Sequence, residues 1–341
     1  MNITTIGIDL AKSIFQLHGA NSCGKKTFSK RVSREKFTEI VQQLPASLIG
    51  MEACGSAHYW ARRFTQMGHR VQLMSPQYVK PYVKTNKNDR NDAEAICEAV
   101  TRPTMRFVAI KTVEQQDIQL LHKVRTKIIK EKVALGNQIR GLLMEYGVAI
   151  PQGDCSLKKA LADLSSIKNS DLTENSIFIF NELYTEFLNL ELRMEQYTKK
   201  LLLISKQNES CKRLMSIPGI GEITSTALIS SIGNFSNFKN GRNLSAWLGL
   251  VPRQNSSGQK TRLLGISKRG DKYLRSLLIH GARAVVNQVK DKVDKTSLWI
   301  KGLLEKNGFN KTVVALANKN ARIAWSVITK DTNYNAEHAH G

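Results

Sequence analysis

Four acidic residues stand at positions where a carboxylate could do chemistry. Asp9 and Glu52 each end a short apolar segment with the pattern of a β-strand, and Asp89 and Asp92 lie three residues apart at the start of a predicted helix. Ligands of open α/β sheets bind at the carboxyl ends of strands, and side chains at i and i+3 share one face of a helix. Four carboxylates brought together repel unless divalent cations neutralise them. All-oxygen sites of this kind suit Mg²⁺ or Mn²⁺.

Two such ions about 4 Å apart would stabilise both the attacking and the leaving oxygen of a phosphoryl transfer. Each residue also has a structural interpretation. Asp89 could cap the helix, and Asp92 could interact favourably with the helix dipole. Glu52 taken alone is no stronger evidence of a metal site. The metal-site prediction therefore depends on whether the four side chains converge.

The segment that positions Asp9 runs from Ile3 to Ala20 and alternates apolar and small or polar residues, which predicts a β-hairpin. Further strands are predicted at 25–31, 47–52 and 70–74. Helices are predicted at 33–43, with Ser33 as a candidate N-cap, at 58–67 and at 88–100. Residues 76–84 read as basic and irregular, and Pro103 marks a boundary. This order predicts an α/β layer fold with a mixed sheet over residues 1–105.

Two long amphipathic helices are predicted in the middle of the chain. Apolar residues recur at helical and near-heptad spacing from Val113 towards Pro151, and again from Ile177 to Ile204. We expect residues 106–205 to form an antiparallel coiled-coil arm or a self-association element. Two ordinary core helices of one domain are the alternative.

The C-terminal part, residues 206–330, is predicted to be mostly helical. Residues 214–233 contain two apolar helical segments around a Pro-Gly-Ile-Gly turn, which resembles a helix-hairpin-helix. There Gly219 and Gly221 would let the backbone approach a phosphate, unless this is an ordinary helical hairpin. Residues 249–270 read as a basic loop without an acid, and 271–288 and 312–329 as closing helices. Residues 331–341, with His338 and His340, are expected to be a frayed tail and not a metal site.

The charge of the chain points to a polyanionic partner. The 341 residues include 51 Lys and Arg against 28 Asp and Glu, a net charge of +23, and residues 206–341 hold 22 of the basic residues. Nucleic acid is the first candidate. The five cysteines show no paired spacing, so we expect neither a zinc site nor disulfides. No signal peptide or long apolar run is found, which predicts a cytoplasmic protein without a membrane partner.

The motifs also carry a resemblance to a known family. The runs Gly7-Ile8-Asp9-Leu10-Ala11-Lys12, Met51-Glu52-Ala53-Cys54-Gly55 and Lys87-Asn88-Asp89-Arg90-Asn91-Asp92-Ala93 are similar in order and spacing to the RuvC-like DEDD domain of insertion-sequence transposases of the 110 family, 1111 subgroup. The second half resembles the family's transposase domain in residues 216–221, in Gly249-Leu250-Val251-Pro252-Arg253 and in Ser257-Gly258. The resemblance spans essentially the whole chain.

This resemblance implies more than the residues alone do. It implies an RNase H-like domain whose metal ligands are Asp9, Glu52, Asp89 and Asp92. For this set the ligand chemistry predicts two Mg²⁺ ions, with Mn²⁺ as a substitute. It implies a serine nucleophile that becomes covalently linked to DNA and maps to Ser257, with Ser256 next to it as an ambiguity. It also implies an element-encoded bridge-type guide RNA that pairs with target and donor DNA, and dimers or tetramers with composite sites.

Basic residues around Ser257 could hold a scissile phosphate. They are Arg253, Lys260, Arg262, Lys268, Arg269, Lys272 and Arg275, with only Asp271 opposed. Without the resemblance, Ser-Ser-Gly indicates only a turn. A serine hydroxyl needs a base or a metal to react, and no histidine is near in sequence. We expect activation to come from the carboxylate site of the same or another protomer.

Three functions follow, and they differ in their tests. The first is a DNA recombinase that excises and inserts its element through a phosphoserine bond, which Ser257→Ala would abolish. The second is a RuvC-like nuclease or junction resolvase that uses metal-activated water and does not need Ser257. The third is a nucleic-acid-binding protein without catalysis, in which Asp9→Asn would change no DNA product. The resemblance favours the first.

Overall fold

The structure, a computed structural model, describes residues 2–84, 88–164, 171–258 and 260–336. Lys87 and the histidines of the predicted tail lie outside these residues. The chain divides into two compact units, Met1–Glu114 and Gln115–Gly341. The first unit thus ends nine residues beyond the boundary expected at 105. No described helix is long and apolar enough to cross a membrane.

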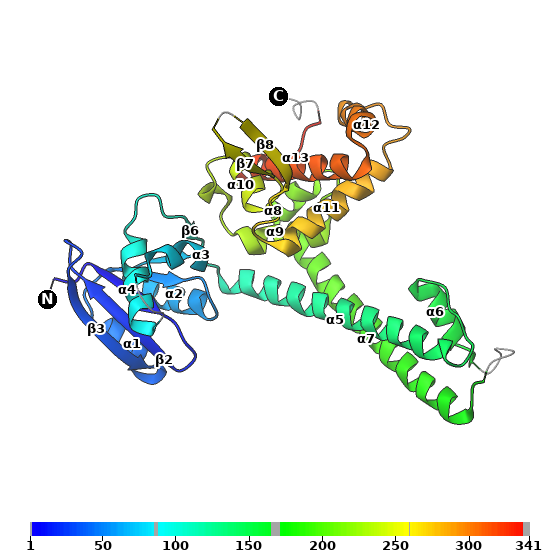
Figure 1. Cartoon of the computed structure of the whole chain (residues 1–341), viewed down its shortest axis with the longest axis horizontal. Coiled ribbons are helices and arrows are strands. Elements are labelled where there is room, and N and C mark those ends of the chain that lie inside the picture. Colours follow the sequence, from blue (N-terminus) through cyan, green and yellow to red (C-terminus); the bar gives the residue numbers. More distant parts are fainter. Residues whose placement is uncertain (1, 85–87, 165–170, 259, 337–341) are drawn as a thin grey trace. The chain divides into compact units, whose positions relative to one another are not determined.

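A mixed six-stranded sheet forms the centre of the first unit (Figure 1). Its strands, in spatial order, are β3 (Lys26–Ser33), β2 (Ile14–Ala20), β1 (Thr5–Asp9), β4 (Leu48–Glu52), β5 (Arg70–Met74) and β6 (Phe107–Val108). The strands β1, β4 and β5 are parallel, whereas β2, β3 and β6 pair antiparallel with their neighbours. The predicted opening hairpin and mixed sheet are confirmed, and β6 was not predicted.

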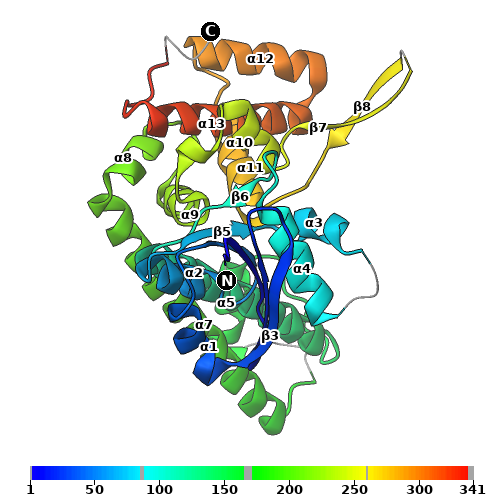
Figure 2. The ribbon, with the colours of Figure 1, turned by 90° about the vertical axis from the view of Figure 1, so that its left-hand side faces the viewer.

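Helices cover both faces of this sheet, as Figure 2 shows. The helices α1 (Arg34–Gln42) and α2 (Ala57–Gln66) lie on one face, where Phe37 and Trp60 pack with buried strand residues such as Ile8. The helix α4 (Asp89–Val100) lies on the other face, against β1, β2 and β4. Ser33 occupies the N-cap position of α1, but its side chain makes no capping hydrogen bond. Residues 76–84, expected to be irregular, contain the short helices α3 (Pro76–Val79) and η1 (Lys80–Tyr82).

Two long helices, α5 (Val113–Met144) and α7 (Glu174–Gln207), lie side by side in the second unit (Figure 1). Their direction is antiparallel, because Arg125 donates to Thr198 at 2.8 Å whereas Lys132, further along α5, meets Glu191, further back along α7, at 3.4 Å. The helix α6 (Asp154–Leu161) packs on the pair and was not predicted. The two predicted helices are confirmed; their role in self-association stays a prediction.

The remainder of the second unit is mostly helical around one apolar core. It consists of α8 (Glu209–Met215), α9 (Glu222–Ile232), η3 (Phe235–Asn237), α10 (Gly241–Trp247), α11 (Lys272–Asn287), α12 (Lys295–Asn307) and α13 (Phe309–Thr329), with β7 (Pro252–Ser257) and β8 (Lys260–Ile266). The predicted closing helices are confirmed. The prediction of a loop over 249–270 is wrong, because β7 and β8 pair as an antiparallel hairpin. An exposed hairpin lacks the apolar alternation by which strands are recognised in sequence.

Candidate active site

The carboxyl ends of β1 and β4 bring the first two acids together. These strands are parallel neighbours in which Ile8 lies opposite Met51, and Asp9 and Glu52 are the next residues along each strand. The pKa of the Cys54 thiol is affected by the charges of both acids, Glu52 and Asp9. Although Cys54 is exposed as a residue, desolvation of its thiol raises the pKa, and the carboxylates of Glu52 and Asp9 raise it further. Both acids therefore lie at one edge of the sheet.

The direction of α4 places its first turn at this same edge. A Cβ at Gly7 would lie 2.2 Å from the carbonyl oxygen of Ala93, so the helix backbone touches the strand there. Cys97, one turn later, contacts the Thr5 carbonyl nearer the start of β1, with a sulfur-to-oxygen distance of 3.8 Å. The helix thus runs opposite to β1. Its first turn, with Asp89 and Asp92, reaches the edge where Asp9 ends its strand.

The cap of α4 is Asn88, whose side-chain oxygen accepts a 2.9 Å hydrogen bond from the Asn91 amide. The alternative that Asp89 itself caps the helix is therefore wrong. Further along α4, Glu98 pairs with Lys84 at 3.0 Å. The ion pairs of the described residues include neither Asp89 nor Asp92. Asp89 and Asp92 thus take no part in the ion pairs that engage Glu94 and Glu98 further along the helix.

The four carboxylates share an edge but do not form a closed cluster. Among the described residues, no group of three or more His, Cys, Asp or Glu side chains is placed to hold a metal ion. The donor set nevertheless fits a hard divalent cation, because all four side chains offer carboxylate oxygens. Asp9 and Glu52 on adjacent strands would form its fixed half, and the first turn of α4 would supply the rest.

Ser257 ends β7 in the second unit, next to the turn glycine Gly258 with φ of 57°. Cross-strand pairs place side chains on a common face. Ser257 lies opposite Lys260, and Asn255, two residues earlier, lies opposite Arg262. One face of the hairpin therefore carries Ser257 together with two cations.

Ser256 points to the opposite face, because successive side chains of a strand alternate. It lies opposite Thr261, and Gln254 on the same face lies opposite Leu263. The Ser256 hydroxyl accepts a 2.8 Å hydrogen bond from the Gln254 amide. The two neighbouring serines thus differ in their surroundings: Ser257 is on the cationic face and Ser256 on an uncharged one.

The remaining predicted nucleic-acid ligands fall into two groups. Arg253, Lys268, Arg269 and Lys272 are exposed at the hairpin and its base. Arg275 is only 8% exposed and donates to the carbonyl oxygens of Leu248 and Arg269 at 3.0 and 3.2 Å. Arg275 therefore fastens the base of the hairpin to α11, and its predicted contact with nucleic acid does not fit this placement. Asp271 caps α11 by accepting from the Tyr273 and Leu274 amides.

The two glycines of the predicted helix-hairpin-helix turn, between α8 and α9, differ in their surroundings. Gly219 has φ of 90° and packs against α11, since a Cβ at Gly281 would lie 1.8 Å from the Gly219 carbonyl oxygen. Close packing thus accounts for Gly219 without a phosphate. Gly221, the N-cap of α9, faces open space. The predicted phosphate contact is therefore sterically open at Gly221 alone.

Comparisons with known proteins agree with these motifs. A DEDD transposase family model matches residues 6–148, and a model described as the transposase IS116/IS110/IS902 family matches residues 211–297. The transposase for insertion sequence element IS1111A of Coxiella burnetii is 49% identical over 333 residues, which make up 98% of this chain and 92% of that protein. The chain belongs to the IS110 family of transposases.

Other members are similar over the same length. A probable family 20 transposase of Pseudomonas aeruginosa is 44% identical over 98% of this chain and 99% of its own. The transposase for element IS1328 of Yersinia enterocolitica is 40% identical, over 97% and 98%. In this IS110-family transposase, the first family match contains the four acids and the second contains Ser257.

Sequence reasoning missed three features that shape these sites. Gly7 lets α4 touch β1, Asn88 caps that helix, and Arg275 anchors the hairpin. An Asn three residues before Asn91, at the start of an apolar pattern, is a recognisable cap signal. The other two depend on contacts between distant segments and have no local signal.

Proposed function

We propose that this protein excises and inserts its insertion sequence by DNA strand cleavage and exchange through a transient 5′-phosphoserine bond at Ser257. In this proposal the first unit is an RNase H-like (RuvC-like) domain, α5 and α7 form a coiled-coil arm, and residues 216–221 form a helix-hairpin-helix-like turn. A bridge-type RNA guides pairing with donor and target DNA. Dimers or tetramers in the cytoplasm carry out the reaction.

The observation that carries the proposal is the surroundings of Ser257. The residue stands at the tip of an exposed hairpin whose described residues include no acid, on the same face as Lys260 and Arg262. Cations on this face would hold a scissile phosphate beside the hydroxyl and offset the charge that develops on it. Ser256 lacks such neighbours, so the geometry favours Ser257 as the nucleophile.

The reaction balances without an external energy source. The Ser257 hydroxyl loses its proton and its Oγ forms a bond to phosphorus, while the bond from phosphorus to the 3′ oxygen breaks and that oxygen takes up a proton. The products are a 5′-phosphoserine and a free 3′ hydroxyl. In the reverse step, the 3′ hydroxyl of a different strand attacks the phosphoserine and releases the serine. Strand exchange thus conserves the number of phosphodiester bonds.

The edge of the sheet where β1 and β4 end, called the carboxylate edge below, would hold the metal. Asp9 and Glu52 on adjacent strands would provide fixed oxygen ligands, and Asp89 and Asp92 would complete the set from the first turn of α4. Bound Mg²⁺ would supply positive charge to both the attacking and the leaving oxygen. Its positive charge would also offset the repulsion between the carboxylates.

A covalent-adduct assay tests the proposal directly. Full-length protein is incubated with DNA carrying the element ends, the candidate RNA and Mg²⁺, and a protein–DNA adduct is sought and mapped by mass spectrometry. We expect an adduct on Ser257 that disappears in Ser257→Ala and in Asp9→Asn. Ser256→Ala is the matched control and should retain it. An adduct that survives Ser257→Ala would overturn the assignment.

Hydrolysis by metal-activated water is the second candidate, because the carboxylate edge lies within one unit and does not itself require a serine. A RuvC-like nuclease or junction resolvase would cleave the same DNA with no adduct. In that case Ser257→Ala would leave the cleavage rate unchanged while Asp9→Asn abolished it.

Composite sites can be tested by mixing two inactive variants. If the serine of one copy works with the carboxylates of another, Ser257→Ala mixed with Asp9→Asn restores activity at about a quarter of the sites of randomly formed dimers. If both groups come from one chain, the mixture stays inactive.

A further inference from the structure

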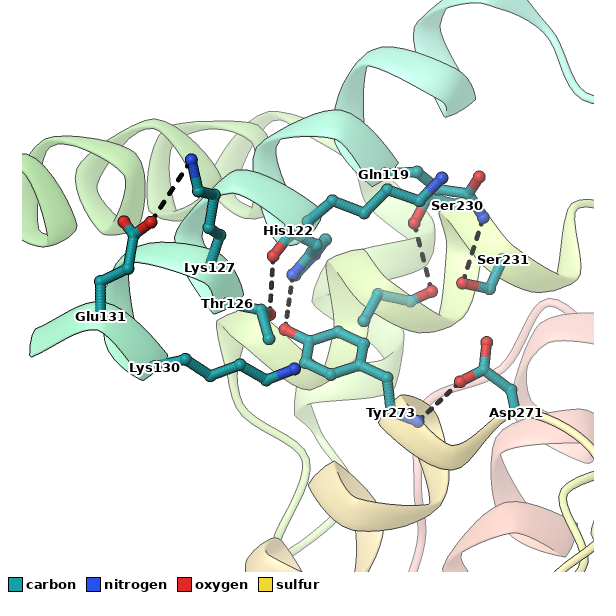
Figure 3. Close-up of a pocket in the computed structure, with 12 residues that line it drawn as sticks. Gln119, His122, Thr126, Lys127, Lys130, Glu131, Ser230, Ser231, Asp271 and Tyr273 are labelled. Carbon is teal, nitrogen blue, oxygen red and sulfur yellow. Dashed lines mark hydrogen bonds and ion pairs between the residues drawn. The ribbon is translucent and has the colours of Figure 1, made fainter. Parts of the chain in front are cut away.

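A cavity of about 470 Å³ lies in the second unit, between α5, α9 and the start of α11. Figure 3 shows the side chains that line it. One wall carries the aromatic ring of Tyr273, another carries Ala227 and Ser231 of α9, and lysines of α5 stand around it. The volume is within the range of small-ligand pockets, about 300 to 1,000 Å³. Neither the acids nor the serine of the proposed reaction line this cavity.

The Tyr273 ring is held by a buried hydrogen-bond chain. Its hydroxyl lies 2.9 Å from Nδ1 of His122, and Nε2 of His122 lies 3.0 Å from the Thr226 hydroxyl. The Thr226 hydroxyl donates to the Glu222 carbonyl at 2.7 Å, so it accepts from Nε2 and the tyrosine donates to Nδ1. This order uses a neutral imidazole, and burial lowers the pKa of His122 to about 4. The aromatic wall is therefore fixed and carries no charge.

The lining carries three lysines against two acids, Glu131 and Asp271. Lys123, Lys127 and Lys130 recur at i, i+4 and i+7, so they form one stripe along α5, and all three are exposed. Lys127 pairs with Glu131 at 3.3 Å, whereas the ion pairs of the described residues include neither Lys123 nor Lys130. Figure 3 shows Lys130 extending towards the Tyr273 ring. The stripe spans about 10 Å along the helix, which is longer than one phosphate.

We propose that this cavity binds an unpaired nucleotide of a single nucleic-acid strand, with its base against Tyr273 and its flanking phosphates along Lys123 and Lys130. Basic grooves with aromatic platforms are how proteins bind single strands. A duplex does not fit, because a stacked and paired base cannot enter a cavity. The length of the lysine stripe favours a strand over a free mononucleotide. The inference rests on the proposed function only in that the protein works on nucleic acid.

The test compares filling the cavity with removing its charges. Ser231→Phe places a ring in the cavity and leaves every lysine, and we expect it to weaken single-strand binding between about 5- and 150-fold, the range for one stacked base. Lys123→Ala with Lys130→Ala should reduce the slope of log affinity against log salt by about 1.4 for single strands. The control is Lys199→Ala with Lys200→Ala on α7, which removes the same charge from two exposed lysines outside the cavity.

Binding is measured by fluorescence anisotropy with labelled single-stranded RNA, single-stranded DNA and duplex DNA. A preference for RNA or for DNA identifies the source of the strand, and duplex binding should not respond to Ser231→Phe. A thio-substituted base in the strand provides a second measurement on the unaltered protein: it should cross-link to the Tyr273 peptide or to residues 227–231. This result remains available if Ser231→Phe fails to fold.

The inference is overturned if Ser231→Phe folds and binds single strands as the unaltered protein does, or if cross-links fall only outside the cavity. The adduct assay is run on the same preparations. If Ser231→Phe leaves single-strand binding unchanged while the Ser257 adduct still forms, this inference is refuted and the proposed function stands. Cross-linking in the cavity without any adduct refutes the phosphoserine reaction and leaves the inference standing.

Discussion

The contact between Gly7 and α4 determines where the first turn of that helix lies, so Gly7→Ala should separate the two pairs of acids. A Cβ at Gly7 would lie 2.2 Å from the Ala93 carbonyl oxygen and 2.4 Å from the Cys97 amide nitrogen. Both are backbone atoms, so no side-chain rotation relieves the clash. Ordinary contact begins at 3.4 Å, and α4 must therefore move outward by about 1 Å, because the interior has no space to absorb it.

The magnitudes follow from this displacement. Overpacking of a core costs about 1 to 3 kcal/mol, and about 2 kcal/mol corresponds to about 30-fold faster amide exchange. A misplacement of about 1 Å in an active site can lower the rate about 100-fold. We therefore expect Gly7→Ala to speed hydrogen exchange in β1 and α4 about 30-fold, as measured by mass spectrometry. DNA cleavage should fall about 100-fold.

Gly50→Ala is the matched control on the neighbouring strand. Its Cβ would meet side-chain atoms of Val100 at 2.8 Å, at the end of α4 remote from the acids. A valine side chain can shift, so we expect a smaller change in exchange and little change in cleavage. If Gly7→Ala cleaves DNA at the unaltered rate, or affects cleavage no more than Gly50→Ala does, the position of the first turn of α4 does not control the reaction.

Three further predictions concern the second unit. Arg275→Ala should lower the free energy of unfolding by about 2 kcal/mol, since the buried carbonyl oxygen of Leu248 loses a charged donor; the salt dependence of DNA binding should stay unchanged. Burial lowers the pKa of His122 from 6.5 to about 4, so the unfolded chain binds more protons between these values. Urea unfolding should show up to about 3 kcal/mol of stability lost as the pH falls from 6.5 to 4, and His122→Gln should remove most of that loss. Lys132→Ala should cost about 1.5 to 3 kcal/mol and expose α6 to proteolysis, because buried Lys132 contacts the half-exposed Asp154 of α6 at 2.7 Å.

Much of the first unit could be predicted because its strands are short, regular and buried. The alternation around Asp9 and the strand that ends at Glu52 correspond to β1 and β4 within a residue or two. What the sequence could not supply was the approach of distant segments. The need for glycine at position 7 follows from the contact with α4, which is more than 80 residues away in the sequence and cannot be recognised locally. The exposed hairpin that carries Ser257 was missed for a different reason: strands without a buried face show no apolar alternation.

The same hairpin explains why the chemistry proposed for Ser257 requires groups beyond its own surroundings. A serine hydroxyl reacts only when a base or a metal accepts its proton, and the described residues of 249–270 include neither an acid nor a histidine. Asp271, the next acid along the chain, is engaged with the Tyr273 and Leu274 amides as the cap of α11. Lysine and arginine stabilise a phosphate but do not take up the proton while they are charged. In the proposed reaction the hairpin would bind the scissile phosphate and present the nucleophile, and the group that takes up the proton would have to come from outside residues 249–270; we propose the carboxylates of the first unit, in the same or another copy.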